Sequence, residues 1–579
     1  MKSNSRTVAA VVVVVAWNAS PVLAGWSASP VTVTATTASI PLVEGCSDGA
    51  YGAFVAWQEE STPGVGALRA QHLLPTGELD PAWLAAGAGA ASVLAARSEL
   101  VALPDRLGGV YLLWKEGETL YATRLEASGA VAAGWPSRGR SLGTLYAYSP
   151  RPGAIEDGAH GFYAAWITSS REAMAIHIGP ANTGAGGWPN EASSISYNDP
   201  FAIWAQLALA PDGGLFVAWA SYGDDGYGAV TPGVWRLQRL TTAGETAVGW
   251  PGGGRDLGVF HYEYISDSRE PTSLLALSED GRGGVFLMKG DPTTPAGYNS
   301  TLETRLYRLQ ANGQSAVDWP AGGVIVPHAA TQYQAAGDDP DASHRLLSDH
   351  RDGVLVGAFK AATDNGSRIE FRQCSAAAQF QAALSAWGPP GYEIAGRDDG
   401  GFYVAFFGCC FDVYQSAYIQ VAQFPAAAGL YEQHFESFGQ WYGDIGLART
   451  DDGGAVFFWS QQQGSVGLFA RRFNAAGEVT AVGPGSSDAP ALSRLRFVPG
   501  VGVRASIGGP VPDRARIELF DLAGRRLASQ AIAPEVHAAR EAAGQEVTIA
   551  GTAALPSGLY FGRLVAGARM AAAKLMVAR

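Results

Sequence analysis

The 579-residue chain is poor in charge and in cysteine, and it has no long apolar run. Charged residues make up 16% of the sequence, and the formal net charge is -13. This acidic balance argues against nucleic acid or an anionic membrane surface as the main partner. The longest apolar run, Val8 to Trp17, is shorter than the roughly 20 residues that a membrane-spanning helix needs. We therefore expect no membrane span in the mature chain.

The N-terminal residues have the pattern of an export signal. Lys2 and Arg6 precede the apolar run, and Val22-Leu23-Ala24 offers small-residue cleavage before Gly25. The pattern predicts a signal peptide over residues 1–24, with a retained anchor as the alternative. Cleavage would place the mature protein outside the cytoplasm.

Only four cysteines occur, and they are scattered. There is no Cys-x-x-Cys and no nearby histidine pair, which argues against a zinc site. In an exported protein a disulfide is the usual role. Cys409 could bridge the adjacent Cys410, or one of them could pair with Cys374, and the sequence does not choose between these pairings.

Motifs of catalysis are also scarce. None of the nine histidines has a metal-ligand spacing. Gly139–Gly143 matches Gly-x-Ser-x-Gly, but a nucleophile elbow needs a helix after it, and β-rich sequence follows here. Sialidase-type boxes are missing, and no spacing brings a pair of carboxylates together. We therefore predict no catalytic residue, no metal and no cofactor.

What the chain does have is a repeated Asp-Gly turn followed by a strand that ends in an aromatic residue. Eight copies recur about every 58 residues, a period typical of propellers and other repeat arrays. They are Asp48–Trp57, Asp105–Trp114, Asp157–Trp166, Asp212–Trp219, Asp280–Met288, Asp352–Phe359, Asp399–Phe406 and Asp452–Trp459.

Each unit reads as four antiparallel strands. In the fourth copy a strand at Ala205–Ala210 precedes the Asp-Gly turn and Leu215–Trp219 returns; Val234–Leu240 and a short segment after Gly249-Trp250-Pro251 complete the unit. The prediction is an all-β fold: an eight-bladed β-propeller over residues 25–489. Seven blades are the alternative, because the sixth and seventh units are degenerate.

Three further predictions concern the scaffold. The repeated tryptophan is expected to fill the wedge between twisted sheets rather than to bind a ligand. The aspartate of the turn is expected to shape the turn rather than to bind calcium. The alternating run Val31–Thr36 predicts a strand that either starts the first repeat or closes the ring against the last one.

Residues 490–579 follow a different pattern. Ala515–Leu527 contains a strand followed by Asp-x-x-Gly-Arg, and Leu555–Leu564 contains Pro-x-Gly-x-Tyr-Phe. These motifs resemble the C-terminal sorting domain of the bacterial type IX secretion system and the related FlgD-like immunoglobulin domain. The resemblance implies a small β-sandwich that directs export through the secretion machinery, and a protein secreted or held at the outer surface of a bacterium. The repeats themselves resemble those of bacterial surface propellers.

The candidate binding site comes from topology. In an up-and-down blade, the connection between strands two and three emerges on the same face as the connection to the next blade. The segments expected there are rich in aromatic and polar residues, which suit contact with a glycan or an extracellular protein. A secreted polysaccharide hydrolase or lyase and a structural surface protein are the alternatives. The candidate residues are Tyr146, Tyr148, Tyr197, Asp199, His261, Tyr262, Tyr264, Trp441 and Tyr442.

Overall fold

The computed structural model is built from strands, and the residues that it describes contain no helix. It therefore shows no helix that could cross a membrane within those residues. The described residues are 30–62, 65–93, 99–146, 152–196, 202–221, 233–260, 274–292, 301–327, 331–332, 344–348, 353–362, 366–380, 384–387, 392–396, 402–408, 418–424, 431–434, 442–450, 454–461, 467–473, 491–498, 502–508, 516–521, 526–532, 545–553, 555, 558–566 and 569–577.

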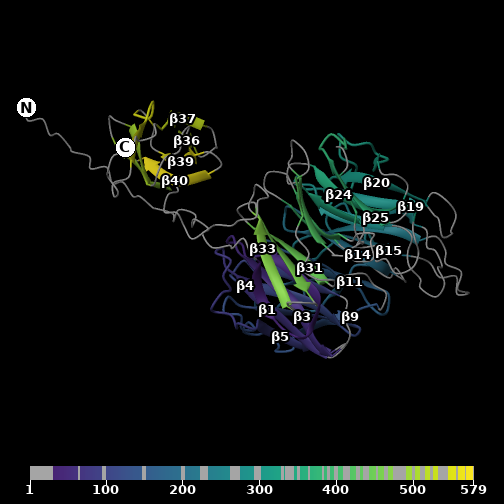
Figure 1. The fold of residues 1–579 in the computed structure, drawn as a ribbon. Helices are drawn as coiled ribbons and strands as arrows, with labels where there is room; N and C mark the ends of the chain where they lie inside the picture. The colour runs from purple at the N-terminus through teal and green to yellow at the C-terminus, as the bar shows by residue number, and fades with distance from the viewer. Residues whose placement is uncertain are drawn as a thin grey trace, which may run out of the picture. The chain divides into compact units, whose positions relative to one another are not determined.

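The chain forms two compact units: one is Ala28–Thr480, and the other contains Ala481–Arg579. In Ala28–Thr480 the described strands form eight antiparallel sheets (Figure 1). Sheet 1 contains β2 (Ser39–Ser47), β3 (Ala53–Thr62), β4 (Val65–Leu73) and β5 (Ala88–Val93); sheet 2 contains β6 (Leu100–Pro104), β7 (Val110–Glu116), β8 (Thr119–Leu125) and β9 (Arg140–Thr144); and sheet 3 contains β10 (Gly153–Glu156), β11 (Phe162–Ile167), β12 (Ala173–Ile178) and β13 (Ser193–Ser194). Sheet 4 contains β14 (Ala202–Leu209), β15 (Leu215–Ser221), β16 (Gly233–Leu240) and β17 (Arg255–Phe260); sheet 5 contains β18 (Leu274–Glu279), β19 (Val285–Pro292), β20 (Thr301–Leu309), β21 (Val324–Ile325) and β22 (Thr331–Gln332); and sheet 6 contains β23 (His344–Ser348), β24 (Val354–Ala362), β25 (Gly366–Cys374) and β26 (Leu384–Trp387). Sheet 7 contains β27 (Tyr392–Gly396), β28 (Phe402–Gly408), β29 (Tyr418–Phe424) and β30 (Tyr431–His434), and sheet 8 contains β1 (Val31–Ala35), β31 (Tyr442–Arg449), β32 (Ala455–Gln461) and β33 (Gly467–Phe473).

The sheets close into a ring. The first strand of each sheet contacts the first strand of the next from β2 through to β31, and β31 contacts β2 in turn. Strand β1 comes from the start of the chain and pairs antiparallel with β33, as the purple and light-green ribbons of Figure 1 show. The fold is a β-propeller of antiparallel sheets, most of them four-stranded, and Val31–Ala35 closes the ring rather than starting the first repeat.

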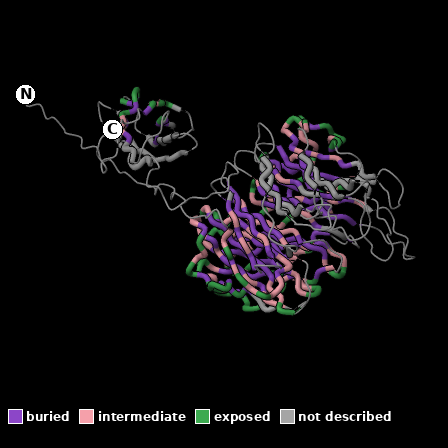
Figure 2. The backbone as a smooth tube through the Cα atoms, viewed as in Figure 1, coloured by how far each residue is buried: buried purple, intermediate pink, exposed green. Residues whose placement is uncertain are grey.

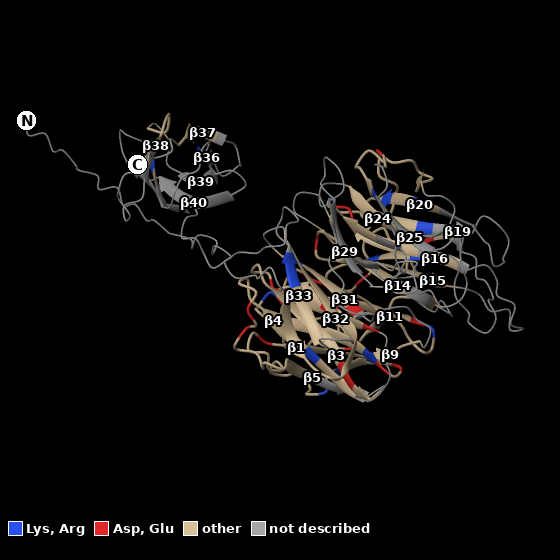
Figure 3. Ribbon diagram, in the orientation of Figure 1, with Lys and Arg blue, Asp and Glu red and all other residues tan. Residues whose placement is uncertain are grey.

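Where its side chains are described, the second strand of a sheet is largely buried, because a neighbouring sheet covers each of its two faces. In β11 and β15 every residue is buried, which explains why these strands read as continuous apolar runs (Figure 2). Many of the charged residues that the structure describes lie near strand ends and turns (Figure 3).

The prediction that the repeated tryptophan fills the wedge between twisted sheets is confirmed in four sheets. Trp57, Trp114, Trp166 and Trp219 are each no more than 2% exposed. Three of these rings have a glycine from the fourth-strand segment of their own sheet directly against them, as Gly139 is against Trp114. Trp459 is partly exposed and stacks on Phe457 and Phe469.

The second unit contains two antiparallel sheets, the small β-sandwich expected from the sequence. One has β34 (Ala491–Val498), β35 (Gly502–Gly508) and β38 (Gln545–Ile549). The other has β36 (Arg516–Asp521), β37 (Arg526–Ala531), β39 (Gly558–Ala566) and β40 (Arg569–Val577), in the order β37-β36-β39-β40. The strand before Asp-x-x-Gly-Arg is β36, and β39 carries the Tyr-Phe of the second motif.

Candidate functional site

Hydrogen bonds bring the two kinds of predicted connection together at one edge of the propeller. The amide of Tyr146, between sheets 2 and 3, donates to the carbonyl of Ile167 at the end of β11 (2.9 Å). The amide of Ala202, entering sheet 4, donates to the carbonyl of Arg171 in the β11–β12 connection (2.8 Å). We call this edge the loop face, and the opposite edge, which carries the Asp-Gly turns, the turn face.

Tyr146 is the one predicted site residue whose side chain is described, and it is partly buried. The guanidinium of Arg171 lies over its ring, 3.9 Å from the centroid. A cation in this position is attracted by the ring quadrupole and also covers part of the ring. The Tyr146 side chain therefore packs against the connections of the loop face.

The other predicted residues are not tested. Tyr148, Tyr197, Asp199, His261, Tyr262, Tyr264 and Trp441 lie outside the described residues, and so do Cys409 and Cys410. Tyr442 begins β31, and its backbone pairs with Gln461. Cys374 is a free, buried thiol whose pKa burial raises to about 12, so no disulfide is formed by this residue in the structure.

On the turn face, a recurring contact joins an aspartate of the first turn to a basic side chain of the third strand. We call each such pair a clip. The clips of the described residues are Asp48–His72, Asp105–Arg124, Asp157–His177, Asp212–Arg239 and Asp280–Arg308. In each clip, one carboxylate oxygen accepts hydrogen bonds from one or two backbone amides of the turn, and the other oxygen accepts a hydrogen bond from the basic side chain. Each clip thus ties the turn between strands one and two to strand three.

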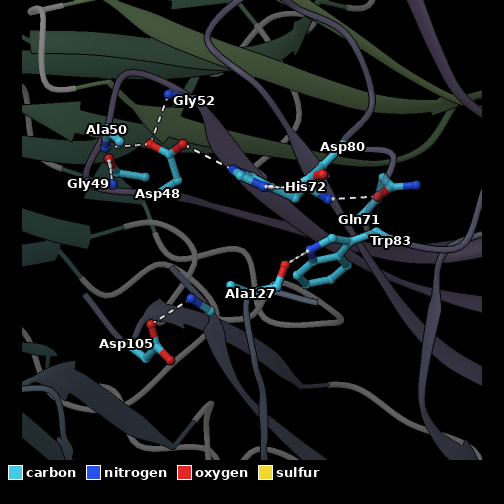
Figure 4. Close-up of polar contacts among 12 residues, drawn as sticks. Asp48, Gly49, Ala50, Gly52, Gln71, His72, Asp80, Trp83, Asp105 and Ala127 are labelled. Atoms are coloured by element: carbon cyan, nitrogen blue, oxygen red, sulfur yellow. Dashed lines mark hydrogen bonds and ion pairs between the residues drawn. The ribbon is translucent and has the colours of Figure 1, made fainter. Parts of the chain in front are cut away.

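The clip of sheet 1 holds a histidine between two carboxylates (Figure 4). His72 Nε2 lies 3.0 Å from Asp48 Oδ2, and Nδ1 lies 2.8 Å from Asp80 Oδ2. The other oxygen of Asp48 accepts the amides of Ala50 (2.7 Å) and Gly52 (2.8 Å). Burial alone would lower the pKa of His72, but the hydrogen bonds and charges of Asp48 and Asp80 outweigh it, and the pKa is raised.

The clip of sheet 3 differs by one carboxylate. His177 keeps the first contact, since its Nε2 lies 2.7 Å from Asp157 Oδ2 while its ring stacks on Tyr163. Ala185 stands where sheet 1 has Asp80, because its amide donates to the carbonyl of His177 as that of Asp80 does to His72. His177 Nδ1 is buried with no hydrogen-bond partner. Burial acts against ionisation of Asp157, but bonds from His177 and from two turn amides lower its pKa overall.

The residue that opens the first turn is not an aspartate in every sheet. A backbone bond closes the turn from the amide of its first residue to the carbonyl four residues on, and that first residue is Asp48, Asp105, Asp157 or Asp280 in four sheets. In sheet 4 it is Ala210, and in sheet 8 it is Thr450. The copies that begin at Asp212 and Asp452 in the sequence therefore start two residues after the residue that opens the turn.

Sequence reasoning missed the basic partner of each clip. The signal was present: a basic residue stands directly before the Leu or Ile that ends the third strand at His72, Arg124, His177, Arg239 and Arg308. Because each partner is separated from its aspartate by 19–28 residues, the short motif alone does not show the pair.

The clips have the contacts expected of side chains that hold the fold together. Both ring nitrogens of His72 face carboxylates, so neither is available to a substrate as a base. Ser141 of Gly-x-Ser-x-Gly lies within β9, as expected, and not at a strand-to-helix turn. Among the described residues, no group of three or more His, Cys, Asp or Glu side chains is placed to hold a metal ion.

No protein-family model matches the chain, and no curated protein does. Among solved structures, the Dos1 propeller matches at 9% identity with a TM-score of 0.40, covering 78% of this chain and 96% of that one. Prolyl oligopeptidase B from Galerina marginata matches at 11% identity with a TM-score of 0.37; 80% of this chain covers 59% of that enzyme. The endo-arabinase from Bacteroides thetaiotaomicron matches at 12% identity with a TM-score of 0.24, over 50% of this chain and 92% of the other. Likenesses this distant say nothing of activity.

Proposed function

We propose that the protein is an exported, non-catalytic β-propeller that binds a glycan or an extracellular protein at its loop face, and that its C-terminal β-sandwich is a secretion and sorting module. The observation that carries the binding proposal is the gathering of the inter-sheet and second-to-third-strand connections at one edge. Binding residues are commonly carried on irregular loops held by a rigid scaffold.

The two faces differ in what occupies their polar side chains. On the turn face, the carboxylates and bases of the five clips are engaged with one another. Each carboxylate lies in the turn between strands one and two, and each basic residue lies at the end of strand three, as expected of groups that hold the scaffold. The connections of the loop face differ in length and sequence between repeats, which is expected of a surface that recognises one partner.

Replacing Tyr262 and Tyr264 together with alanine is expected to weaken glycan binding about tenfold, because tyrosine rings commonly dominate such contacts. The measurement is a glycan array with the full secreted chain, followed by titration of the glycan that binds best. Tyr51→Ala is the matched control, since Tyr51 lies in the Asp48–Gly52 turn on the turn face. Unchanged affinity in the double variant would remove this loop from the site, and equal losses in both variants would place the effect in folding.

The sorting proposal rests on the resemblance of residues 490–579 and on the observed sandwich. Deleting these residues is expected to keep the protein from reaching the cell surface or medium of a bacterium with a type IX system. Cell fractionation and immunoblotting measure this. Normal secretion of the truncated chain would contradict the proposed module while leaving the binding proposal intact.

A further inference from the structure

The ring closes at a seam between sheet 8 and sheet 1, where chain segments about 400 residues apart meet. Near the loop face, the amide of Val43 donates to Asp444 Oδ2 (2.8 Å), and the hydroxyl of Ser460 donates to the carbonyl of Ile40 (2.8 Å). On the turn face, Arg472 Nη1 donates to the carbonyl of Pro75 (3.3 Å).

The Pro75 carbonyl belongs to the turn that the sheet 1 clip holds in place. This turn follows His72 and runs to Asp80, whose amide donates to the carbonyl of His72 (2.8 Å) and whose carboxylate binds its ring. Trp83 lies against the His72 ring and donates its Nε1–H to the carbonyl of Ala127 in sheet 2 (2.9 Å). The His72 side chain therefore adds side-chain bonds to the backbone bonds that fix the turn next to the seam to sheet 1.

With both carboxylates ionised, a doubly protonated imidazole is the form that can donate a hydrogen bond to each of them. Both nitrogens of His72 face carboxylate oxygens within 3.0 Å, and a neutral ring has one N–H donor and one lone pair. The lone pair of a neutral ring would face a carboxylate oxygen, so one of the two contacts would be lost. Sheets 2, 4 and 5 have arginine at this position, which stays charged at every physiological pH.

We propose that His72, held between Asp48 and Asp80, is a pH-sensitive latch on the seam that closes the propeller. When protonated, the latch fixes the turn whose Pro75 carbonyl accepts Arg472 from the last sheet. When neutral, it releases one carboxylate and loosens that turn. The charged groups around the ring are Asp48 from the β2–β3 turn, Asp80 from the β4–β5 connection and, through Pro75, Arg472 of sheet 8; Phe54 and Trp83 cover the ring itself.

The direction of the effect follows from the raised pKa of His72. The latch contributes its full stability below the unfolded-state pKa of 6.5 and loses it as the pH rises through the higher folded-state pKa. Mild alkali should therefore loosen the seam. The arginine clips of sheets 2, 4 and 5 are unaffected over the same pH range.

Amide hydrogen exchange of the full chain tests the latch, with wild type and variants compared at the same pH so that intrinsic exchange rates cancel. His72→Arg keeps the cation at every pH, and His72→Gln removes it. At about pH 5.5 we expect peptides covering β1 and Leu73–Asp80 to exchange alike in wild type and His72→Arg. At about pH 8.5 they should exchange about fivefold faster in wild type, the factor that corresponds to one hydrogen bond.

His72→Gln should exchange fast in these peptides at both pH values, which keeps the test valid if arginine does not fit. The peptide covering β15 of sheet 4 is the internal reference, and His177→Arg, in a clip away from the seam, is the matched control. A seam that exchanges equally in wild type and His72→Gln at acidic pH would overturn the latch, and so would the same pH response in all variants.

Discussion

Replacing Asp280 with alanine is expected to lower the free energy of unfolding by about 3–5 kcal/mol, the loss typical of breaking a buried ion pair from one side. Asp280 and Arg308 are each about 5% exposed, and Arg308 Nε donates to Asp280 Oδ2 at 2.9 Å. The other carboxylate oxygen accepts the amides of Arg282 and Gly284 at 2.8 and 2.7 Å. Alanine removes all three bonds and leaves the guanidinium without its carboxylate. Urea denaturation followed by tryptophan fluorescence measures the change.

Asp212→Ala is the matched control, because Asp212 contacts Arg239 from a carboxylate that is 57% exposed. Water solvates such a pair, so its loss should cost no more than about 1 kcal/mol. Equal losses in the two variants would show that burial does not set the strength of a clip. A small loss in both would assign the clips to positioning rather than stability.

The repeat predicted much of the fold. Alternating strands and Asp-Gly turns are set by residues close together in the chain, so the motif strands and the wedge role of Trp57, Trp114, Trp166 and Trp219 could be read from the sequence. Closure of the ring could not be read from the sequence, because it depends on pairing Val31 with Ala470. The alternation in Val31–Thr36 predicts one of the two strands of this pair but does not identify its partner. The opening of two turns by Ala210 and Thr450 could not be predicted either, for a similar reason. Asp-Gly marks a positive backbone φ, but the residue that opens the turn is fixed by a backbone bond that leaves no trace in side-chain identity.

The candidate site was predictable only to the level of a face. Strand order dictates which connections emerge together, and the bonds from Tyr146 to Ile167 and from Ala202 to Arg171 bear this out. Whether an aromatic ring on that face points outward depends on its neighbours. Tyr146 shows why: Arg171, 25 residues away, lies over its ring, and nothing in the tyrosine-rich motif indicates this.

The second large effect is expected from Gly139→Ala, which should lower the free energy of unfolding by about 2–5 kcal/mol. Gly139 has a φ of +81°, and a Cβ there would lie 2.3 Å from Cη2 of Trp114. The indole cannot move aside, since Trp114 is 2% exposed and stacks on Tyr121. Gly117→Ala is the control: its φ is +61°, but a Cβ there meets nothing within 4 Å. It should therefore cost only the conformational part, about 1 kcal/mol.

A double variant separates the steric part from the conformational part. Phenylalanine is shorter than tryptophan and lacks the atoms that the new Cβ would meet, so Trp114→Phe should relieve the contact. The loss in Trp114→Phe/Gly139→Ala should then be smaller than the sum of the two single losses by about 1–3 kcal/mol. Additive losses would mean that the positive φ alone requires glycine. A coupled result would mean that Trp114 and Gly139 have to be chosen together in sheet 2.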